Sequence, residues 1–138
     1  MLMHAIRSIE IYAPFAEVFN FIADPPNLPR WAHAFEAASA KSARLRTPDG
    51  VAEIALRVEA SLAQGTVDWI MTFSDGSIGT AMSRVTPLRA GGVVYSFVLN
   101  APPLPLEVLE GALAQQTRTL ETELSRLKDI LETGHGRG

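Results

Sequence analysis

LEVLEGALAQQTRTLETELSRLKDIL, residues 106–131, is the stretch that decides the fold of this 138-residue chain. Its leucines recur at three- and four-residue steps, which places them on one face of a helix. No glycine or proline follows Gly111 within it. A long helix with one apolar face needs a large apolar surface to lie on, and the shorter apolar segments before it can supply one. The leucines of this stripe are Leu106, Leu109, Leu113, Leu120, Leu124, Leu127 and Leu131.

The composition predicts one domain with a sizeable core. Hydrophobic residues make up 47% of the chain, which is enough for such a core. The net charge is −3, and the sequence has no basic block of the kind that nucleic-acid binding requires. The absence of cysteine excludes disulfides and thiolate metal sites. The first residues lack the pattern of a signal peptide, and no apolar run is long enough to span a membrane. We expect a cytoplasmic domain over residues 1–133 and a disordered tail over 134–138.

The first third of the chain predicts a strand, two short helices and one ambiguous segment. A strand over residues 3–11 precedes a helix over 14–23, whose apolar positions share one side. A second short helix over 28–34 carries Trp31 and His33. Residues 35–47 are rich in alanine, which favours a helix, although tertiary context can make such a segment one or two strands.

Residues 65–87, GTVDWIMTFSDGSIGTAMSRVTP, carry the clearest hairpin signal. The Asp-Gly pair at 75–76 favours a two-residue turn. That register pairs Trp69 with Met82 and puts Arg84 on the same, bulky face, which we assign to the core. A slip of one residue would reverse the assignment. Residues 51–60 and 93–100 alternate as two further strands.

This order of elements, with IEIYAPFAEVFNFIADPPNLPRWA at residues 9–32, resembles the START-like superfamily, also called SRPBCC. The superfamily includes polyketide cyclases, and the ends of the later strands look like an uncharacterised bacterial branch. The resemblance covers nearly the whole chain and is specific for fold more than for chemistry. The features that match the superfamily are Ala13-Pro14, Val18-Phe19, Asp24-Pro25 and Leu28 to Trp31. Those that look like the bacterial branch are Thr66 to Trp69, Ser83 to Val85 and Ser125 to Lys128.

What the resemblance implies is an α+β, helix-grip fold. A curved antiparallel sheet of about six or seven strands would wrap the long C-terminal helix, with two short helices after the first strand. Members of the superfamily bind lipids, sterols, polyketides or other apolar molecules in a cavity between sheet and helix. Some are cyclases or dehydratases.

Arg84 and Tyr95 are the candidates for a polar end of such a cavity. An arginine beside Trp69 would clamp a carboxylate or stabilise an enolate-like oxygen. The alternative is that Arg84 reaches out to solvent. A buried phenol needs a partner, which makes Tyr95 a plausible neighbour of Arg84. His33 would serve as a general acid or base at the cavity mouth, or it is simply exposed.

The remaining candidates form an apolar wall, for which ordinary core packing is the alternative. On the long helix, Gln116 and Thr117 interrupt the leucine stripe, and they either face a cavity or point just off the stripe. The residues expected to bind a ligand are Arg84, Tyr95, Trp69, Met71, Met82, Phe97, Trp31, His33, Leu113, Gln116, Thr117 and Leu120.

Three functions follow as hypotheses. The first is binding of a small apolar or aromatic metabolite or lipid between sheet and helix. The second is a polyketide cyclase or dehydratase that uses the same cavity, with His33 or Arg84 in an acid–base or oxyanion role. The third is a protein-interaction module with a filled cavity. We expect no cofactor or metal, a small hydrophobic ligand as partner, and neither nucleic acid nor a membrane span; a homodimer stays open.

Overall fold

The computed structural model describes residues 4–47, 50–100 and 106–133, without the side chains of residue 47 and of 106–113. The tail over 134–138 therefore lies outside the described residues. The strands are β1 (His4–Ile11), β2 (Phe35–Ala38), β3 (Ser42–Thr47), β4 (Gly50–Ser61), β5 (Thr66–Thr72), β6 (Ile78–Pro87) and β7 (Val93–Asn100). The helices are α1 (Phe15–Ala23), a single 3₁₀ turn (Pro25–Asn27), α2 (Leu28–Trp31) and α3 (Leu106–Thr133).

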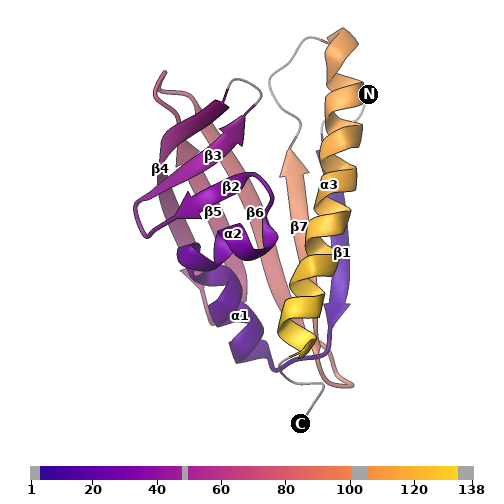
Figure 1. Ribbon diagram of the computed structural model, residues 1–138. Coiled ribbons are helices and arrows are strands. Elements are labelled where there is room, and N and C mark those ends of the chain that lie inside the picture. Colours follow the sequence, from indigo (N-terminus) through magenta and orange to yellow (C-terminus); the bar gives the residue numbers. More distant parts are fainter. Residues whose placement is uncertain (1–3, 48–49, 101–105, 134–138) are drawn as a thin grey trace.

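The seven strands form one antiparallel sheet in the order β1-β7-β6-β5-β4-β3-β2. Figure 1 shows α3 lying along β1 and β7, while α1 and α2 lie over the other half of the sheet, on the same face. Strand alternation directs one set of side chains toward these helices, so the core lies between the helices and the sheet. The expected α+β, helix-grip architecture is confirmed.

The first two helices form much as their sequences predict. Pro14 precedes the first turn of α1, whose apolar positions Val18, Phe19 and Ile22 are buried. The double proline that follows makes a 3₁₀ turn, which the Asn27 side chain ties back to the chain by donating to the carbonyl of Phe21 at 3.1 Å. Helix α2 ends at Trp31 and is shorter than expected.

Residues 35–47 form two strands, the second of the alternatives that the sequence left open. Strand β2 pairs with β3 through an irregular register near Phe35, and β3 pairs regularly with β4. Ala43 and Leu45 are buried against the core. Long-range pairing and this burial therefore override the helix propensity of the alanines.

The register predicted for the β5–β6 hairpin is wrong by one residue. Trp69 pairs with Ala81, and Asp68 pairs with Met82. The connection has three residues between Phe73 and Ser77, whose main chains are hydrogen-bonded, and Gly76 takes φ +87° at its last position. A three-residue loop with a left-handed glycine is the next commonest hairpin connection after the two-residue turn.

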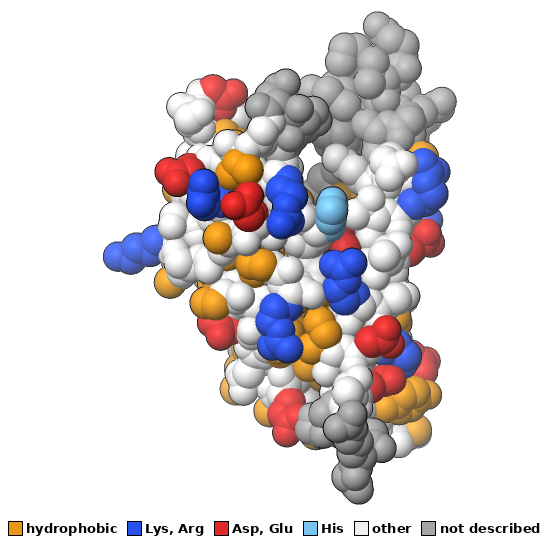
Figure 2. Space-filling view, in the orientation of Figure 1, with side chains coloured by type: hydrophobic (Ala, Val, Ile, Leu, Met, Phe, Trp, Pro, Cys, Tyr) orange, Lys and Arg blue, Asp and Glu red, His pale blue; other side chains and the backbone are white. Residues whose placement is uncertain are grey.

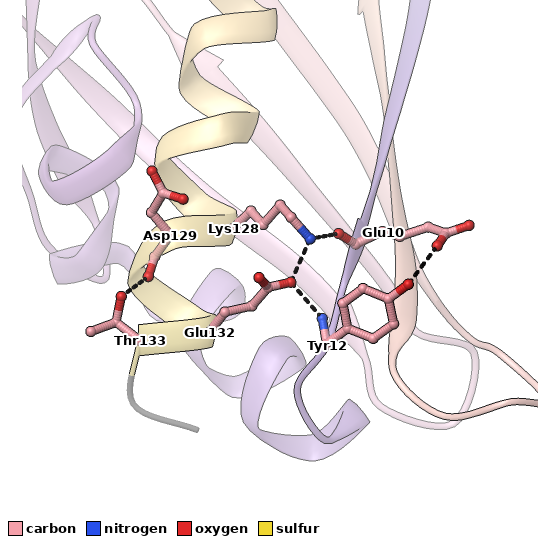
Figure 3. A network of polar contacts seen from close by, with 6 residues as sticks. All are labelled: Glu10, Tyr12, Lys128, Asp129, Glu132 and Thr133. Atoms are coloured by element: carbon pink, nitrogen blue, oxygen red, sulfur yellow. Dashed lines mark hydrogen bonds and ion pairs between the residues drawn. The ribbon is translucent and has the colours of Figure 1, made fainter. Parts of the chain in front are cut away.

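Helix α3 buries the leucine stripe over its described half. Its neighbours are mainly β1 and α2. Its last turns also make polar contacts with β1, where Lys128 Nζ donates to the Glu10 carbonyl at 2.7 Å and Glu132 accepts from the Tyr12 N–H at 2.8 Å (Figure 3). Leu106, Leu109 and Leu113 lie outside the described side chains. The buried stripe residues are Leu120, Leu124, Leu127 and Leu131.

Within the described residues, no helix combines the length and the hydropathy that crossing a membrane would take.

Candidate functional site

Four aromatic side chains from three different elements meet on the inner face of the sheet. Trp31 comes from α2, Trp69 from β5, and Tyr95 and Phe97 from β7. The Trp31 ring lies 6.2 Å from that of Tyr95, edge to face, and 6.4 Å from that of Trp69. Phe97 joins Trp69 at 6.0 Å and Tyr95 at 6.5 Å. We call these four residues the aromatic cluster.

The local sequence explains how each ring reaches this place. The proline turn and the end of α2 aim Trp31 at the sheet, since the Ala32 N–H closes the helix on the Leu28 carbonyl at 2.7 Å. Strand alternation puts Trp69 on the inner face of β5, as predicted, and likewise Tyr95 and Phe97 on β7. Trp31, Trp69 and Tyr95 are all buried.

The polar atoms of the cluster have no hydrogen-bond partner among the described residues. They are Nε1 of Trp31, Nε1 of Trp69 and the hydroxyl of Tyr95. Buried donors in native proteins are nearly always satisfied, and each unsatisfied one costs about 1–3 kcal/mol. Three such donors therefore meet in one connected cluster.

The surroundings of Tyr95 keep its phenol neutral. Burial raises the pKa of Tyr95 far above its ordinary value, and the negative charges of Asp68 and Glu123 raise it further. The Ser83 hydroxyl, which donates to the Val67 carbonyl at 2.7 Å, lowers the pKa of Tyr95 by less than burial raises it. Tyr95 therefore has a proton to donate throughout the physiological range.

Glu123 of α3 is an acidic group whose charge acts on Tyr95, after that of Asp68. Burial raises its pKa, against the opposing effects of a hydrogen bond from the His33 N–H and of the Arg126 charge. The His33 peptide is held on both sides, since its N–H donates to Glu123 Oε2 and its carbonyl accepts from Arg46 Nη1 at 2.7 Å. The segment directly after Trp31 is thereby fastened to α3.

Two of the predicted site residues lie on the opposite face of the sheet. The true register turns Met82 and Arg84 outward and Ser83 and Val85 inward. Arg84 is exposed, and its Nε donates to the Gln64 carbonyl at 3.1 Å. The expectation that Arg84 lies beside Trp69 and orients a ligand with Tyr95 is wrong in its geometry, because Tyr95 pairs with Val85 on the other face.

The other predicted positions divide between the core and the surface. On α3, Thr117 and Leu120 are buried and Gln116 is exposed, so the two polar residues of the stripe have different environments. Met71 packs at the edge of the core, and the His33 side chain is exposed. Leu113 lies outside the described side chains. The ligand-binding roles of all these residues stay predictions.

The sequence reasoning missed Glu123 and Ser83. Glu123 follows Leu120 by three residues and precedes Leu127 by four, which is the spacing of the buried stripe. Ser83 went unnoticed because the assumed register turned it outward. The stripe spacing could therefore have indicated that Glu123 lies near the core. The inward orientation of Ser83 could not be predicted in the same way, because it depends on the length of the β5–β6 connection.

The described residues also form a half-open hollow of about 360 Å³ away from the aromatic cluster, at the β2–β3 hairpin and β4. It is lined by Ala37, Ala38, Ser39, Ser42, Ala43, Arg44, Glu53 and Ile54. Figure 2 shows that side chains of both charges are spread over the face that carries the helices. No group of three or more metal-ligating side chains occurs in the described part of the chain.

Comparison with known proteins finds similarity in structure alone. No family model matches the sequence, and no curated protein matches it. XoxI from Bacillus cereus superposes with a TM-score of 0.69 at 14% identity, over 94% of this chain and 96% of that one. A START superfamily protein from Mycobacterium smegmatis gives 0.63 at 13% identity, over 94% and 97%.

A third solved structure is the di-domain ARO/CYC protein BexL from the BE-7585A biosynthetic pathway. Its TM-score is 0.66 at 19% identity, and the match covers 95% of this chain and 47% of BexL. These identities are low, so the similarity concerns the fold. With the antiparallel sheet, the two short helices and the long C-terminal helix, it shows that the chain has a START/SRPBCC-like fold.

Proposed function

We propose that this protein binds a small apolar or aromatic molecule between the sheet and α3, at the aromatic cluster. The observation that carries the proposal is the set of three buried donors without a partner among the described residues. A bound molecule with acceptor oxygens would satisfy those donors, and the rings would pack on its apolar body. The cost of leaving the donors unpaired in the free protein would then be recovered on binding.

The fold supports a small-molecule role. One of the similar structures is an ARO/CYC protein of a biosynthetic pathway, although the likeness to this chain is one of fold. The cyclase or dehydratase hypothesis has less support, because Arg84 and the His33 side chain, the groups expected to do chemistry, are exposed, whereas the cluster is buried. Binding without reaction is therefore the function that the geometry supports best.

The first experiment looks for the molecule itself. The protein purified from its host is denatured, extracted and analysed by mass spectrometry, and the emptied protein is then screened by thermal shift against a panel of lipids and polycyclic aromatic ketones. We expect at least one compound to be recovered or to raise the melting temperature. If no compound is recovered and none in the panel raises the melting temperature, the proposal is contradicted. That result would favour the interaction module with a filled cavity.

The second experiment localises the binding to the cluster. Tyr95→Phe removes one unpaired donor, and we expect a loss of about 5- to 10-fold in affinity, the value of one hydrogen bond. Tyr12→Phe is the matched control, since Tyr12 is 64% exposed and does not belong to the aromatic cluster. Equal effects of the two substitutions on affinity would place the site elsewhere.

A further inference from the structure

The aromatic cluster offers hydrogen-bond donors of one kind, and this bears on the chemistry of the ligand. An indole N–H can only donate, so Trp31 and Trp69 each require an acceptor. The Tyr95 hydroxyl also carries a proton that no described residue accepts. The complementary group on a ligand is therefore an acceptor oxygen, and a ligand that is purely hydrocarbon would leave all three donors unsatisfied.

The charges that act on the Tyr95 hydroxyl are the negative ones of Asp68 and Glu123. On the elements that carry the cluster and on the adjacent strand β6, the basic residues are Arg30 and Arg84. Arg84 lies on the outer face of the sheet, and the Arg30 guanidinium lies over the Phe21 ring at 5.0 Å. On β1, Arg7 is paired with Glu121 at 3.1 Å.

The acidic groups around the cluster make a negative charge on a bound ligand less favourable. Glu123 lies beside the segment that follows Trp31, where it accepts the His33 N–H. Asp68 neighbours Trp69 on β5 and is half-buried. Both charges raise the pKa of Tyr95, which means that both make a negative charge at that place less favourable. A carboxylate brought into this apolar region would be desolvated without a cation to pair with.

We infer that the ligand presents a neutral acceptor oxygen, such as a ketone or ester carbonyl, to Trp31, Trp69 and Tyr95, and that the site discriminates against carboxylates. This inference rests on the proposed function and specifies the ligand class of that same site. It replaces the carboxylate clamp that the sequence suggested for Arg84.

Three naphthalenes of nearly equal size test it. They are 2-ethylnaphthalene, 2-acetylnaphthalene and 2-naphthoate, and their dissociation constants are measured through the tryptophan fluorescence or by calorimetry. We expect the ketone to bind about 10-fold more tightly than the hydrocarbon, as one to two recovered hydrogen bonds imply. We expect the carboxylate to bind at least about 10-fold more weakly than the ketone.

Variants test separately the preference for a neutral acceptor oxygen and the discrimination against carboxylates. Tyr95→Phe should reduce the preference for the ketone over the hydrocarbon by about 5-fold or more. Glu123→Gln should reduce the preference for the ketone over the carboxylate by about 3-fold or more, because it removes a negative charge. Glu121→Gln is the control for charge, since Glu121 is exposed and on the Arg7 side of α3, and it should leave that ratio unchanged.

The outcomes distinguish this inference from the proposed function. Equal binding of the ketone and the hydrocarbon, or tighter binding of the carboxylate, would overturn the ligand class and still support an apolar binding site. If none of the three naphthalenes binds, and the lipid and ketone panel also gives no shift, both the inference and the proposed function are contradicted.

Discussion

Two glutamates of α3 make the same kind of contact in two different regions of the molecule. Glu132 accepts the backbone N–H of Tyr12, just after β1, at 2.8 Å. Glu123 accepts the backbone N–H of His33, just after α2. Each contact fastens the helix to a segment far away in the sequence, yet the pKa values of the two carboxyls move in opposite directions.

The difference comes from the deeper burial of Glu123 and from the hydrogen bonds and charges beside each carboxylate. At Glu132, burial acts to raise the pKa, but the hydrogen bonds from Lys128 and Tyr12 and the Lys128 charge outweigh it and hold the pKa below its ordinary value. Figure 3 shows Lys128 between Glu132 and the Glu10 carbonyl. At Glu123, burial dominates and raises the pKa over the opposing effects of the His33 N–H and the Arg126 charge.

The comparison teaches that a shared hydrogen bond does not give two residues the same role. The Glu132 contact is charge-compensated and lies at the outer end of β1, where it satisfies backbone groups of an edge strand. The Glu123 contact leaves a poorly compensated charge next to a cluster of unpaired donors. The first arrangement is typical of stability, and the second is typical of a functional site.

The largest effect is expected where one residue supports both contacts. Leu127 is fully buried, four residues after Glu123 and five before Glu132. Leu127→Ala should lower the free energy of unfolding by about 2–5 kcal/mol, because it leaves a cavity under the helix. Urea denaturation measures this, with the exposed Ser125→Ala as control, expected within about 0.5 kcal/mol of the parent. A loss below about 1 kcal/mol would show that α3 is not anchored here.

Replacing each carboxylate by its amide should change the free energy of unfolding differently at the two contacts. Glu132→Gln should lower the free energy of unfolding by about 1 kcal/mol at neutral pH, at the low end for charged hydrogen bonds because the network is partly exposed. Glu123→Gln should leave it unchanged or raise it slightly, because it removes a buried charge. Equal destabilisation by both substitutions, measured in urea, would refute the distinction.

The contributions of Glu132 and Glu123 to stability should depend on pH with opposite signs and over different pH ranges. The pKa of Glu132 is lowered, so its stabilisation is complete above the ordinary value of 4.5 and is lost as the pH falls below that value. The pKa of Glu123 is raised, so its contribution is complete below 4.5 and is lost as the pH rises above that value. Urea denaturation of the parent and the two amide variants across this range checks both. Overlapping windows would contradict the assignment of the shifts.

The smallest effect is expected from removing the compensating charge. Lys128→Met should raise the pKa of Glu132, because burial then acts with less opposition. Arg126→Met should raise the pKa of Glu123 further, by a lesser amount, since Arg126 is the weakest of the influences there. Carboxyl carbon NMR titration follows both groups. An unchanged pKa of Glu132 in Lys128→Met would mean that the Tyr12 hydrogen bond alone accounts for its shift.

Periodicity allowed the sequence to predict most elements and their inner faces. The leucine stripe of α3, the apolar side of α1 and the alternation of β4 are patterns that only one secondary structure accommodates. The four aromatic residues of the cluster, Phe97 included, were all expected to be near a ligand, and the structure brings their rings together. Their role as a binding site stays a prediction.

The length of one loop could not be predicted. Asp75-Gly76 fits both a two-residue and a three-residue connection, and the Asp75 carboxylate stabilises the longer one by accepting the N–H and hydroxyl of Ser77 at 2.9 and 2.6 Å. Since side chains alternate with a period of two, that one residue exchanged Arg84 for Val85 on the inner face. The free-energy cost of burying the Arg84 charge was the one sign in the sequence that the two-residue register was wrong.

The amino-acid sequence by itself therefore determined which segments are helices and strands and which side of most of them is apolar, because periodicity is a local property. Tertiary structure alone decided the strands of residues 35–47, the inward face of β6 and the environment of Glu123. Those outcomes depend on pairing and burial between residues far apart in the chain. The long helix that organises the fold carries the compensated Glu132 and the poorly compensated Glu123, and only the packed structure distinguishes them.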